Sequence, residues 1–383
     1  MNDIIYFDNS ATTKVIPPIR DAVVSCLEEY YGNPSSPHRL GTKANSLINE
    51  ARRSLALALA CSAEEIFFTS GGTEANNLCI KGAAWARRRL GQHVITTKIE
   101  HASVLETCKY LETVGFEVTY LDVDQSGIVN VEQLAKALTP ETILVSIMWV
   151  NNETGAIQPI GDICRLLEQA TPRPLLHVDA VQALGKLPLN ELAPGIDLLT
   201  VSGHKIHGPK GVGAAKIKQD LNLIPLFHGG GQEGQLRSGT ENVPGIHALG
   251  LAVKLAIEDL AVSSQRILRM RNRLVEELKD IAGCQINTPL ECSVPHILNV
   301  SFLGFPGEML LHHLEAKGLY IGTGAACSSR KAQGSHVLRA MGFSDEAIAG
   351  SCRISLGRLN TEEEIPRAVR IIKETLAELV HFV

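Results

Sequence analysis

Apolar residues gather along the chain in short, nearly uninterrupted blocks, and most of these blocks end in small or polar residues. Residues 142–150 are the clearest example, because almost every one of them is apolar or β-branched. Such a run is typical of a parallel strand that is buried on both faces. Similar blocks predict further strands at residues 4–7, 65–69, 93–97, 116–121, 175–178 and 196–201.

Between these strands, apolar residues recur at the spacing of a helix. A further helix is expected to start after residue 70. Strands that alternate with helices are typical of an α/β domain with a mainly parallel sheet between helices. The helices are expected at residues 17–30, 42–60, 131–138 and 160–169.

The pattern changes near residue 244, where longer helical segments begin. Later strands and covering helices indicate a second, smaller α+β module. We therefore predict a large domain at residues 15–255 and a small domain formed by residues 1–14 and 256–383. The elements behind this division are helices at 246–260, 267–278, 307–317 and from 362 onward, and strands at 296–302 and 352–356.

Size and composition agree with two soluble domains. The chain has 383 residues, with 45% hydrophobic and 20% charged residues, and single cores stop growing at about 250–300 residues. A net charge of −5 opposes a nucleic-acid binder that neutralises phosphates with clustered lysine and arginine. Since no apolar run is long enough to span a membrane and the start does not resemble a secretory signal, we expect a cytoplasmic protein without membrane or direct nucleic-acid contacts.

Candidate ligand-binding residues follow the predicted strands, at the edge of the sheet where open α/β proteins bind ligands. Gly72 and Thr73 begin a helix directly after a strand, where free amides, the helix dipole and close backbone approach suit a phosphate. His101 follows the strand at 93–97 and could stack on a cofactor ring. The alternatives are that Thr73 simply caps its helix and that His101 is a structural histidine.

Two further charged residues stand at strand ends. Asp179 is costly to bury unless it is paired, and either a pyridinium N–H group or a turn amide could pair with it. Lys205 lies between a buried strand and a Gly-Pro-Lys-Gly turn. Desolvation there would favour the neutral amine that attacks an aldehyde cofactor, although a solvated surface turn is the alternative. His204 and His207 lack a third ligand at a credible spacing, so no metal is expected.

One of the nine cysteines differs from the others in its surroundings. Cys327 lies in a loop of small and polar residues, and Arg330 and Lys331 follow it. Nearby cations lower the pKa of a thiol and so favour a nucleophilic thiolate. The other cysteines form no Cys-x-x-Cys pair, and we expect most of them to be small buried hydrophobic residues.

These motifs, taken in order over essentially the whole chain, resemble the class V aminotransferase group of pyridoxal-phosphate enzymes, and within it the cysteine desulfurases of the NifS/IscS kind. Each motif alone is weakly specific, whereas the ordered set is very specific. The motifs are Gly32-Asn33-Pro34-Ser35-Ser36, Ser70-Gly71-Gly72-Thr73-Glu74-Ala75-Asn76-Asn77, Glu100-His101, Asn151-Asn152-Glu153, Asp179-Ala180-Val181-Gln182, Ser202-Gly203-His204-Lys205, Arg237-Ser238-Gly239-Thr240, the Cys327 loop with Ser335-His336-Val337-Leu338, and Arg353-Ile354-Ser355-Leu356-Gly357-Arg358.

The resemblance implies a fold type I enzyme with a seven-stranded sheet, in which Lys205 binds pyridoxal 5′-phosphate covalently. It implies that Asp179 pairs with the pyridine nitrogen and that His101 stacks on the ring and transfers protons. Gln182 and Asn152 would contact the ring hydroxyl or the substrate. The phosphate would be held by Gly72, Thr73, Ser202 and His204, and by Thr240 from the other subunit of a homodimer.

The substrate implied by the resemblance is L-cysteine. Arg353 would bind its carboxylate through the planar guanidinium, with Asn33 as a further substrate contact. The Cys327 thiolate would attack the substrate sulfur, leaving L-alanine and a Cys327 persulfide. The sulfur would then pass to an acceptor protein, such as an iron–sulfur scaffold, for cluster assembly or thio-modification.

The chain departs from the family pattern in the cysteine loop. Ala325 stands where the family often has serine, and Gln333-Gly334 stands where it often has Glu-Pro. These differences bear on loop conformation and on the choice of acceptor. Selenocysteine lyase, another aminotransferase-type activity on the same fold and a non-catalytic nucleotide-binding regulator remain alternatives from the sequence.

Overall fold

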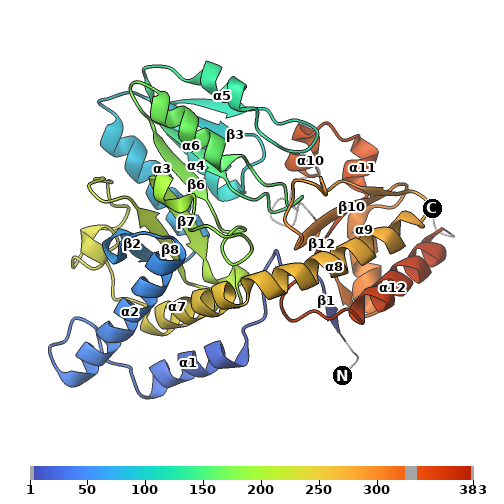
Figure 1. Cartoon of the computed structure of the whole chain (residues 1–383), viewed down its shortest axis with the longest axis horizontal. Helices are drawn as coiled ribbons and strands as arrows, with labels where there is room; N and C mark the ends of the chain where they lie inside the picture. The colour runs from blue at the N-terminus through green and yellow to red at the C-terminus, as the bar shows by residue number, and fades with distance from the viewer. Residues whose placement is uncertain (1–3, 324–333, 381–383) are drawn as a thin grey trace.

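The computed structural model describes residues 4–323 and 334–380 and is built around a seven-stranded sheet (Figure 1). The strand order is β2-β8-β7-β6-β5-β3-β4. Strand β8 runs antiparallel to both of its neighbours, and every other adjacent pair is parallel. The predicted fold class, a mainly parallel seven-stranded sheet between helices, is therefore confirmed.

The bounds of most predicted elements agree with the structure to within a few residues, although α8 begins at Leu260 and not near residue 267. The strands are β1 Ile5–Tyr6, β2 Ile66–Thr69, β3 His93–Thr97, β4 Glu117–Leu121, β5 Thr142–Met148, β6 Leu175–Asp179, β7 Leu198–Ser202, β8 Gly213–Ile217, β9 Cys284–Ile286, β10 Ile297–Phe302, β11 Leu319–Tyr320 and β12 Ser351–Ser355. The α-helices are α1 Pro17–Glu28, α2 Arg39–Ala58, α3 Gly72–Arg87, α4 Ala102–Thr113, α5 Val131–Ala137, α6 Ile160–Gln169, α7 Val243–Glu258, α8 Leu260–Lys279, α9 Gly307–Ala316, α10 His336–Ala340, α11 Asp345–Ala349 and α12 Glu364–Leu379. Short 3₁₀ turns are η1 Ala63–Glu65, η2 Ala193–Gly195, η3 Gly203–Lys205 and η4 Glu233–Gln235.

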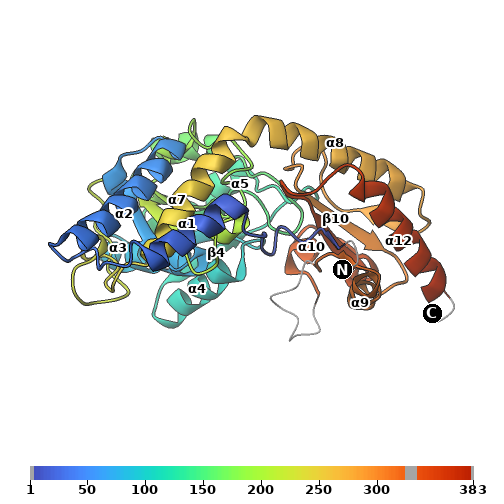
Figure 2. The ribbon, with the colours of Figure 1, turned by 90° about the horizontal axis from the view of Figure 1, so that it is seen from below.

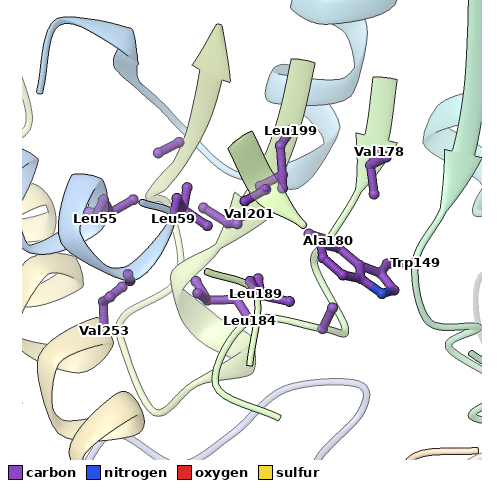
Figure 3. Packing of buried hydrophobic residues seen from close by; sticks show 14 of the residues in the cluster. Leu55, Leu59, Trp149, Val178, Ala180, Leu184, Leu189, Leu199, Val201 and Val253 are labelled. Carbon is purple, nitrogen blue, oxygen red and sulfur yellow. The ribbon is translucent and has the colours of Figure 1, made fainter. Parts of the chain in front are cut away.

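Helices cover both faces of the large sheet. Successive residues of each central strand point to opposite sides, so a strand that is apolar throughout needs cover on both faces. In β5, Leu144 packs in one cluster with α3 and α4, whereas Val145 packs in another with α2, α5, α6 and α7. All seven residues of β5 are buried. Figure 3 shows part of the second cluster, in which Leu199 and Val201 of β7 lie between Val178 of β6 and the α2 side chains. Burial on both faces explains why these strands read as uninterrupted apolar runs.

A smaller three-stranded sheet, β12-β10-β9, lies beside the large one and is covered by α8, α9 and α12 (Figure 2). Strand β1 at the start of the chain pairs with β11 in the same part of the molecule. Ile5 and Phe7 share a buried cluster with residues of α8 and α12. Helices α7 and α8 meet at Asp259, close to the predicted boundary. These clusters support the division at residues 14 and 255, which stays a proposal.

Several elements were not predicted from the sequence, among them the twelve-residue helix α4 and strand β8, and the others are short. Strands β9 and β11 and helices α10 and α11 contain two to five residues each. Segments this short have no measurable period, so only their tertiary contacts define them. Within the part of the chain that the structure describes, no helix is long and apolar enough to cross a membrane.

Candidate active site

A cavity of about 1060 Å³ opens at the carboxyl ends of the central strands, between the large sheet and β12. In an open α/β sheet this edge is the usual place for a ligand. Most of the residues singled out in the sequence line it, although they come from segments far apart in the chain. These are Gly72, Thr73, His101, Asn152, Asp179, Gln182, Ser202, His204, Lys205 and Arg353.

One end of the cavity is formed by the start of α3. Gly71, which precedes the helix, has a φ of +153°, a value that side-chain-bearing residues rarely adopt. A Cβ atom at Gly72 would lie 2.9 Å from Cγ2 of Val181, so only glycine allows this approach to the turn after β6. Thr73 and Ser202 line the cavity beside it. The first amides of a helix have no intrahelical acceptor, and this end therefore suits an anion.

A buried hydrogen-bond chain joins the acid of the site to its histidine. Asn76 donates from Nδ2 to Asp179 Oδ2 at 2.7 Å and to Ser103 Oγ at 2.9 Å. Ser103 Oγ lies 2.8 Å from Nδ1 of His101. Burial lowers the pKa of His101 against the attraction of Asp179, so the ring is uncharged at neutral pH. The chain fixes both Asp179 and His101 on the cavity wall.

Replacing Asn76 by alanine tests this chain. Asn76 also accepts a hydrogen bond from Oγ1 of Thr200, so Asn76→Ala removes one hydrogen-bond partner from each of three buried polar side chains. Leaving such groups unsatisfied should lower the free energy of unfolding by about 3 kcal/mol, measured by chemical denaturation of the cofactor-free protein. Asn77→Ala is the matched control, because Asn77 makes one exposed hydrogen bond to the backbone of its helix. Equal losses in the two variants would contradict the structural role of Asn76.

Glu100 precedes His101 in the loop after β3 and is fully buried. Oε1 of Glu100 accepts hydrogen bonds from Oγ1 of Thr97 at 2.8 Å and from the amide of Met148 at 3.0 Å. Burial raises the pKa of Glu100 to about 8, so its carboxyl group is protonated and uncharged at neutral pH. Glu100 thus ties the end of β3 to the end of β5 without adding charge beneath the cavity.

Lys205 ends the 3₁₀ turn η3 that follows β7, and its side chain reaches the polar turn after β1. Its Nζ donates to the carbonyl oxygens of Ser10 at 2.5 Å and Ala11 at 2.8 Å. The neighbouring His204 has a pKa lowered to about 4, first by burial and then by nearby lysines including Lys205. The His204 ring is therefore uncharged at neutral pH and can donate one N–H hydrogen bond.

Arg353 of β12 closes the opposite side of the cavity and is 4% exposed. Nη1 donates to the carbonyl of Asn152 at 3.0 Å, and Nη2 pairs with Oδ1 of Asp8 at 2.9 Å. Each of these nitrogens carries two hydrogens, so one on each remains for a carboxylate. A Cβ atom added at Gly322 would lie 3.0 Å from Nη2 of Arg353. The backbone just before residue 324 therefore lies next to this guanidinium.

Three predicted site residues are not among the described residues that line this cavity. Asn33 lies on an exposed loop, where its Oδ1 accepts a hydrogen bond from the amide of Ser35 at 3.0 Å. Thr240 is exposed near the start of α7. Cys327 lies outside the described residues, so the structure does not test its prediction. The contributions of Asn33 and Thr240 also stay predictions.

The arrangement of a lysine, an acid, an uncharged histidine and a helix start around one cavity agrees with comparisons with known proteins. A model of the family "Aminotransferase class-V" matches residues 5–367. The chain belongs to this family. Its members depend on pyridoxal phosphate.

Relatives match over nearly the full length. The chain is 45% identical to a "Cysteine desulfurase IscS" of Methanosarcina thermophila, over 99% of this chain and 93% of that protein. It is 42% identical to a protein of the same description from Dictyoglomus turgidum, over 98% and 95% of the two chains. A solved structure described as a NifS-like protein superposes with a TM-score of 0.93 at 42% identity, covering 98% of this chain and 100% of that one.

The donor set fits pyridoxal phosphate. At Gly72 the start of α3 lies close to the turn after β6, and Ser202 lines the cavity beside it. The first helix amides and the Ser202 hydroxyl are the donors that a phosphate requires. Asp179 is 5% exposed and lies on the wall of the same cavity, where it can meet a pyridinium N–H. Lys205 lines the cavity with its amine held on two backbone carbonyls. Phosphate, ring nitrogen and aldehyde thus each find a suitable group.

Sequence reasoning assigned no role to several residues that shape the site. Asn76 follows Gly72 by one helical turn, and this spacing could have placed it on the cavity face of α3. Ser10 belongs to the polar turn after β1, which the sequence does not connect to Lys205. His336 lines the cavity, and its Nε2 lies 3.0 Å from the carbonyl oxygen of Glu100. Only the tertiary structure places Ser10 and His336 here.

Proposed function

We propose that the protein is a pyridoxal-phosphate-dependent cysteine desulfurase, which converts L-cysteine to L-alanine and transfers the sulfur to Cys327. The observation that carries this proposal is the single cavity lined by Lys205, Asp179, His101 and Arg353. Relatives named cysteine desulfurase at 42–45% identity over nearly the full length support the same reaction. In this family the bound cofactor supplies an electron sink for the bonds at the substrate Cα.

The residues around the cavity would divide the work of binding. Thr73, Ser202 and the first amides of α3 would hold the phosphate, with the uncharged His204 as a further donor. Asp179, fixed by Asn76, would hold a proton on the pyridine nitrogen. Gln182 and Asn152 would orient the ring hydroxyl and the substrate.

Lys205 would hold the cofactor until the substrate amine replaces it. Once released, its amine can take a proton from the substrate Cα and return one later. Nδ1 of His101 contacts Ser103. Its other ring nitrogen, Nε2, would accept or donate a second proton near the cofactor ring. The free hydrogens on the two Nη atoms of Arg353 would bind the substrate carboxylate and so orient the thiol away from the phosphate end.

The sulfur transfer requires a thiolate, and the described cysteines do not provide it. None of these eight cysteines lines the cavity. Burial raises the pKa values of their thiols, to about 11 for Cys61 and Cys284 and about 12 for Cys108. Cys327 follows Gly322 by five positions in the sequence, and the flanking Gly334 lines the cavity. These observations support Cys327 as the nucleophile.

In this step the Cys327 thiolate attacks the substrate sulfur. An S–S bond forms and the substrate Cβ–S bond breaks, with its electron pair remaining on the carbon side. Protons delivered at Cβ and Cα complete alanine, and Cys327 is left as a persulfide. The persulfide would be passed to an acceptor protein, with an iron–sulfur scaffold as the expected class, in the cytoplasm.

A homodimer is part of the proposal. The exposed Thr240 would add a hydroxyl to the phosphate site of the other subunit, and Asn33 would contact the substrate. Support comes from the placement of both residues on exposed loops outside the cavity of their own chain.

The proposed function is tested by incubating the purified, pyridoxal-phosphate-loaded protein with L-cysteine. We expect a yellow protein, stoichiometric alanine and a mass increase of one sulfur atom on the peptide that contains Cys327. Borohydride should remove the colour and leave a reduced adduct on Lys205. A colourless protein that binds no pyridoxal phosphate, or a persulfide on another cysteine, would contradict the proposal.

A further inference from the structure

A second, smaller cavity of about 30 Å³ lies behind Lys205. Lys205 and Ser10 line both this cavity and the large one. The smaller cavity is also lined by Lys186, His296 and Arg358, whereas none of the described residues around it is an acid. A cavity in which a buried lysine has only cationic and neutral neighbours is unusual, because buried charges are normally paired with opposite ones.

Lys186 lines this cavity and has no role in the proposed reaction. Its side chain is buried, with the residue 8% exposed, and Nζ donates to Oε1 of Gln182. Gln182 in turn donates from Nε2 to the carbonyl of Ser10 at 3.0 Å. The same carbonyl accepts the hydrogen bond from Nζ of Lys205. The two lysines are therefore linked through one amide and one carbonyl.

We propose that Lys186 is a positioning residue for the active-site lysine: it fixes the orientation of the Gln182 amide and places a second amine behind Lys205. An amide has one donor end and one acceptor end. In its charged form Lys186 has donors only, so it holds Oε1 of Gln182 towards itself, and the Gln182 NH₂ group donates to Ser10 at the large cavity. This inference rests on the proposed function, in which Lys205 must present an uncharged amine to the cofactor aldehyde.

The groups around Lys186 disfavour a second positive charge beside Lys205. Burial lowers the pKa of Lys186 to about 7, and repulsion from Lys205 and Arg353 adds to the shift. Repulsion between two like charges is mutual, so each lysine disfavours a proton on the other. Asp179 lines the same large cavity as Lys205, and a negative charge there acts in the opposite direction.

None of the described residues that line the smaller cavity beside Lys205 is an acid. Burial lowers the pKa values of His204, His207 and His296, and Lys186 contributes to each of these shifts. Arg358 also lines the smaller cavity and is paired with Asp259 at 2.8 Å. Behind Lys205, Lys186 is thus the charged group that can exchange its proton near neutral pH.

Lys216 provides the contrast that separates positioning from ordinary burial. It is 2% exposed on β8, and its Nζ donates to the carbonyls of Ala193 and Ile196. Burial lowers its pKa as well, but Glu65 and Asp197 act against that shift. Lys216 is therefore a buried lysine near acids and away from both cavities, whereas the charged groups that shift Lys186 are all cations.

The test is the rate at which Lys205 is labelled by an amine acylating agent in the full-length, cofactor-free protein, followed by mass spectrometry across a pH series. Lys186→Met removes the charge and the donor at nearly constant length. Lys205 should then hold its proton more tightly, and its labelling rate at neutral pH should fall about threefold or more. In the pyridoxal-phosphate-loaded protein, the pH midpoint of the visible absorbance should also move.

Lys216→Met is the matched control and should leave the Lys205 labelling rate unchanged even if it lowers thermal stability. If Lys186→Met does not fold, Lys186→Gln must give the same fall in labelling. An unchanged or faster labelling rate in the folded variant, or an equal fall in Lys216→Met, would overturn the role of Lys186. A wild-type protein that takes up no pyridoxal phosphate would instead contradict the proposed function.

Discussion

Lys205→Ala should abolish desulfurase activity, lowering kcat/KM by about 10³-fold or more, because it removes the residue proposed both as the covalent anchor of the cofactor and as the proton carrier. The variant should still bind pyridoxal phosphate through the helix start and Asp179. We expect its absorbance to lack the pH-dependent band of the wild type and borohydride to leave no adduct on the chain. Activity is measured as alanine released from L-cysteine.

Lys210→Ala is the matched control for this change. Lys210 belongs to the same turn but is exposed and does not line the cavity. Its removal should leave the colour and the borohydride adduct intact and change alanine formation less than twofold, since surface substitutions are usually near neutral. Retention of the adduct in Lys205→Ala would show that another lysine binds the cofactor, and Lys186 would be the first to test.

Cys327→Ser should remove sulfur transfer while leaving the cofactor site in place. Serine keeps the size of the side chain but is a far weaker nucleophile than a thiolate, and alanine formation should fall by about 10³-fold or more. The variant should remain yellow, and its absorbance should still change when L-cysteine is added, because the residues proposed to bind the cofactor and the substrate, Lys205 and Arg353, are unchanged. The peptide that contains residue 327 should gain no sulfur in the mass spectrum.

Cys292→Ser provides the comparison at a partly buried cysteine whose thiol pKa is raised by burial. That variant should keep full alanine production and full persulfide formation at Cys327. If Cys327→Ser instead retained full activity, the sulfur would have to leave by another route. The reaction would then be closer to a lyase, which is the alternative that the sequence left open.

The placement of the candidate residues at the strand ends was predictable because parallel strands place their carboxyl ends along one edge of a sheet. His101, Asp179 and Lys205 each follow an apolar run in the sequence, and the topology brings these runs together in β3, β6 and β7. The predicted positions could therefore be read without coordinates. The order of the strands could not, since it depends on which helix covers which face.

Other parts of the site were inaccessible to sequence reasoning. Ser10 and Lys205 are almost two hundred positions apart, and no local pattern links them. The same holds for Arg353 and Asp8, whose ion pair forms only when β12 and the turn after β1 meet beside the large sheet. A lysine such as Lys186 also gives no signal by itself, because burial is decided by what folds over it.

The sequence alone determined the α/β class and the chemical identity of the groups, because buried parallel strands require apolar runs and catalysis requires particular side chains. The tertiary structure decided which groups share a cavity and how their pKa values shift, because burial and distance are long-range properties. It alone placed Asn76 between Asp179 and Ser103, and it alone placed Lys186 behind Lys205. The sequence specifies the residue types, and the fold determines their electrostatic behaviour.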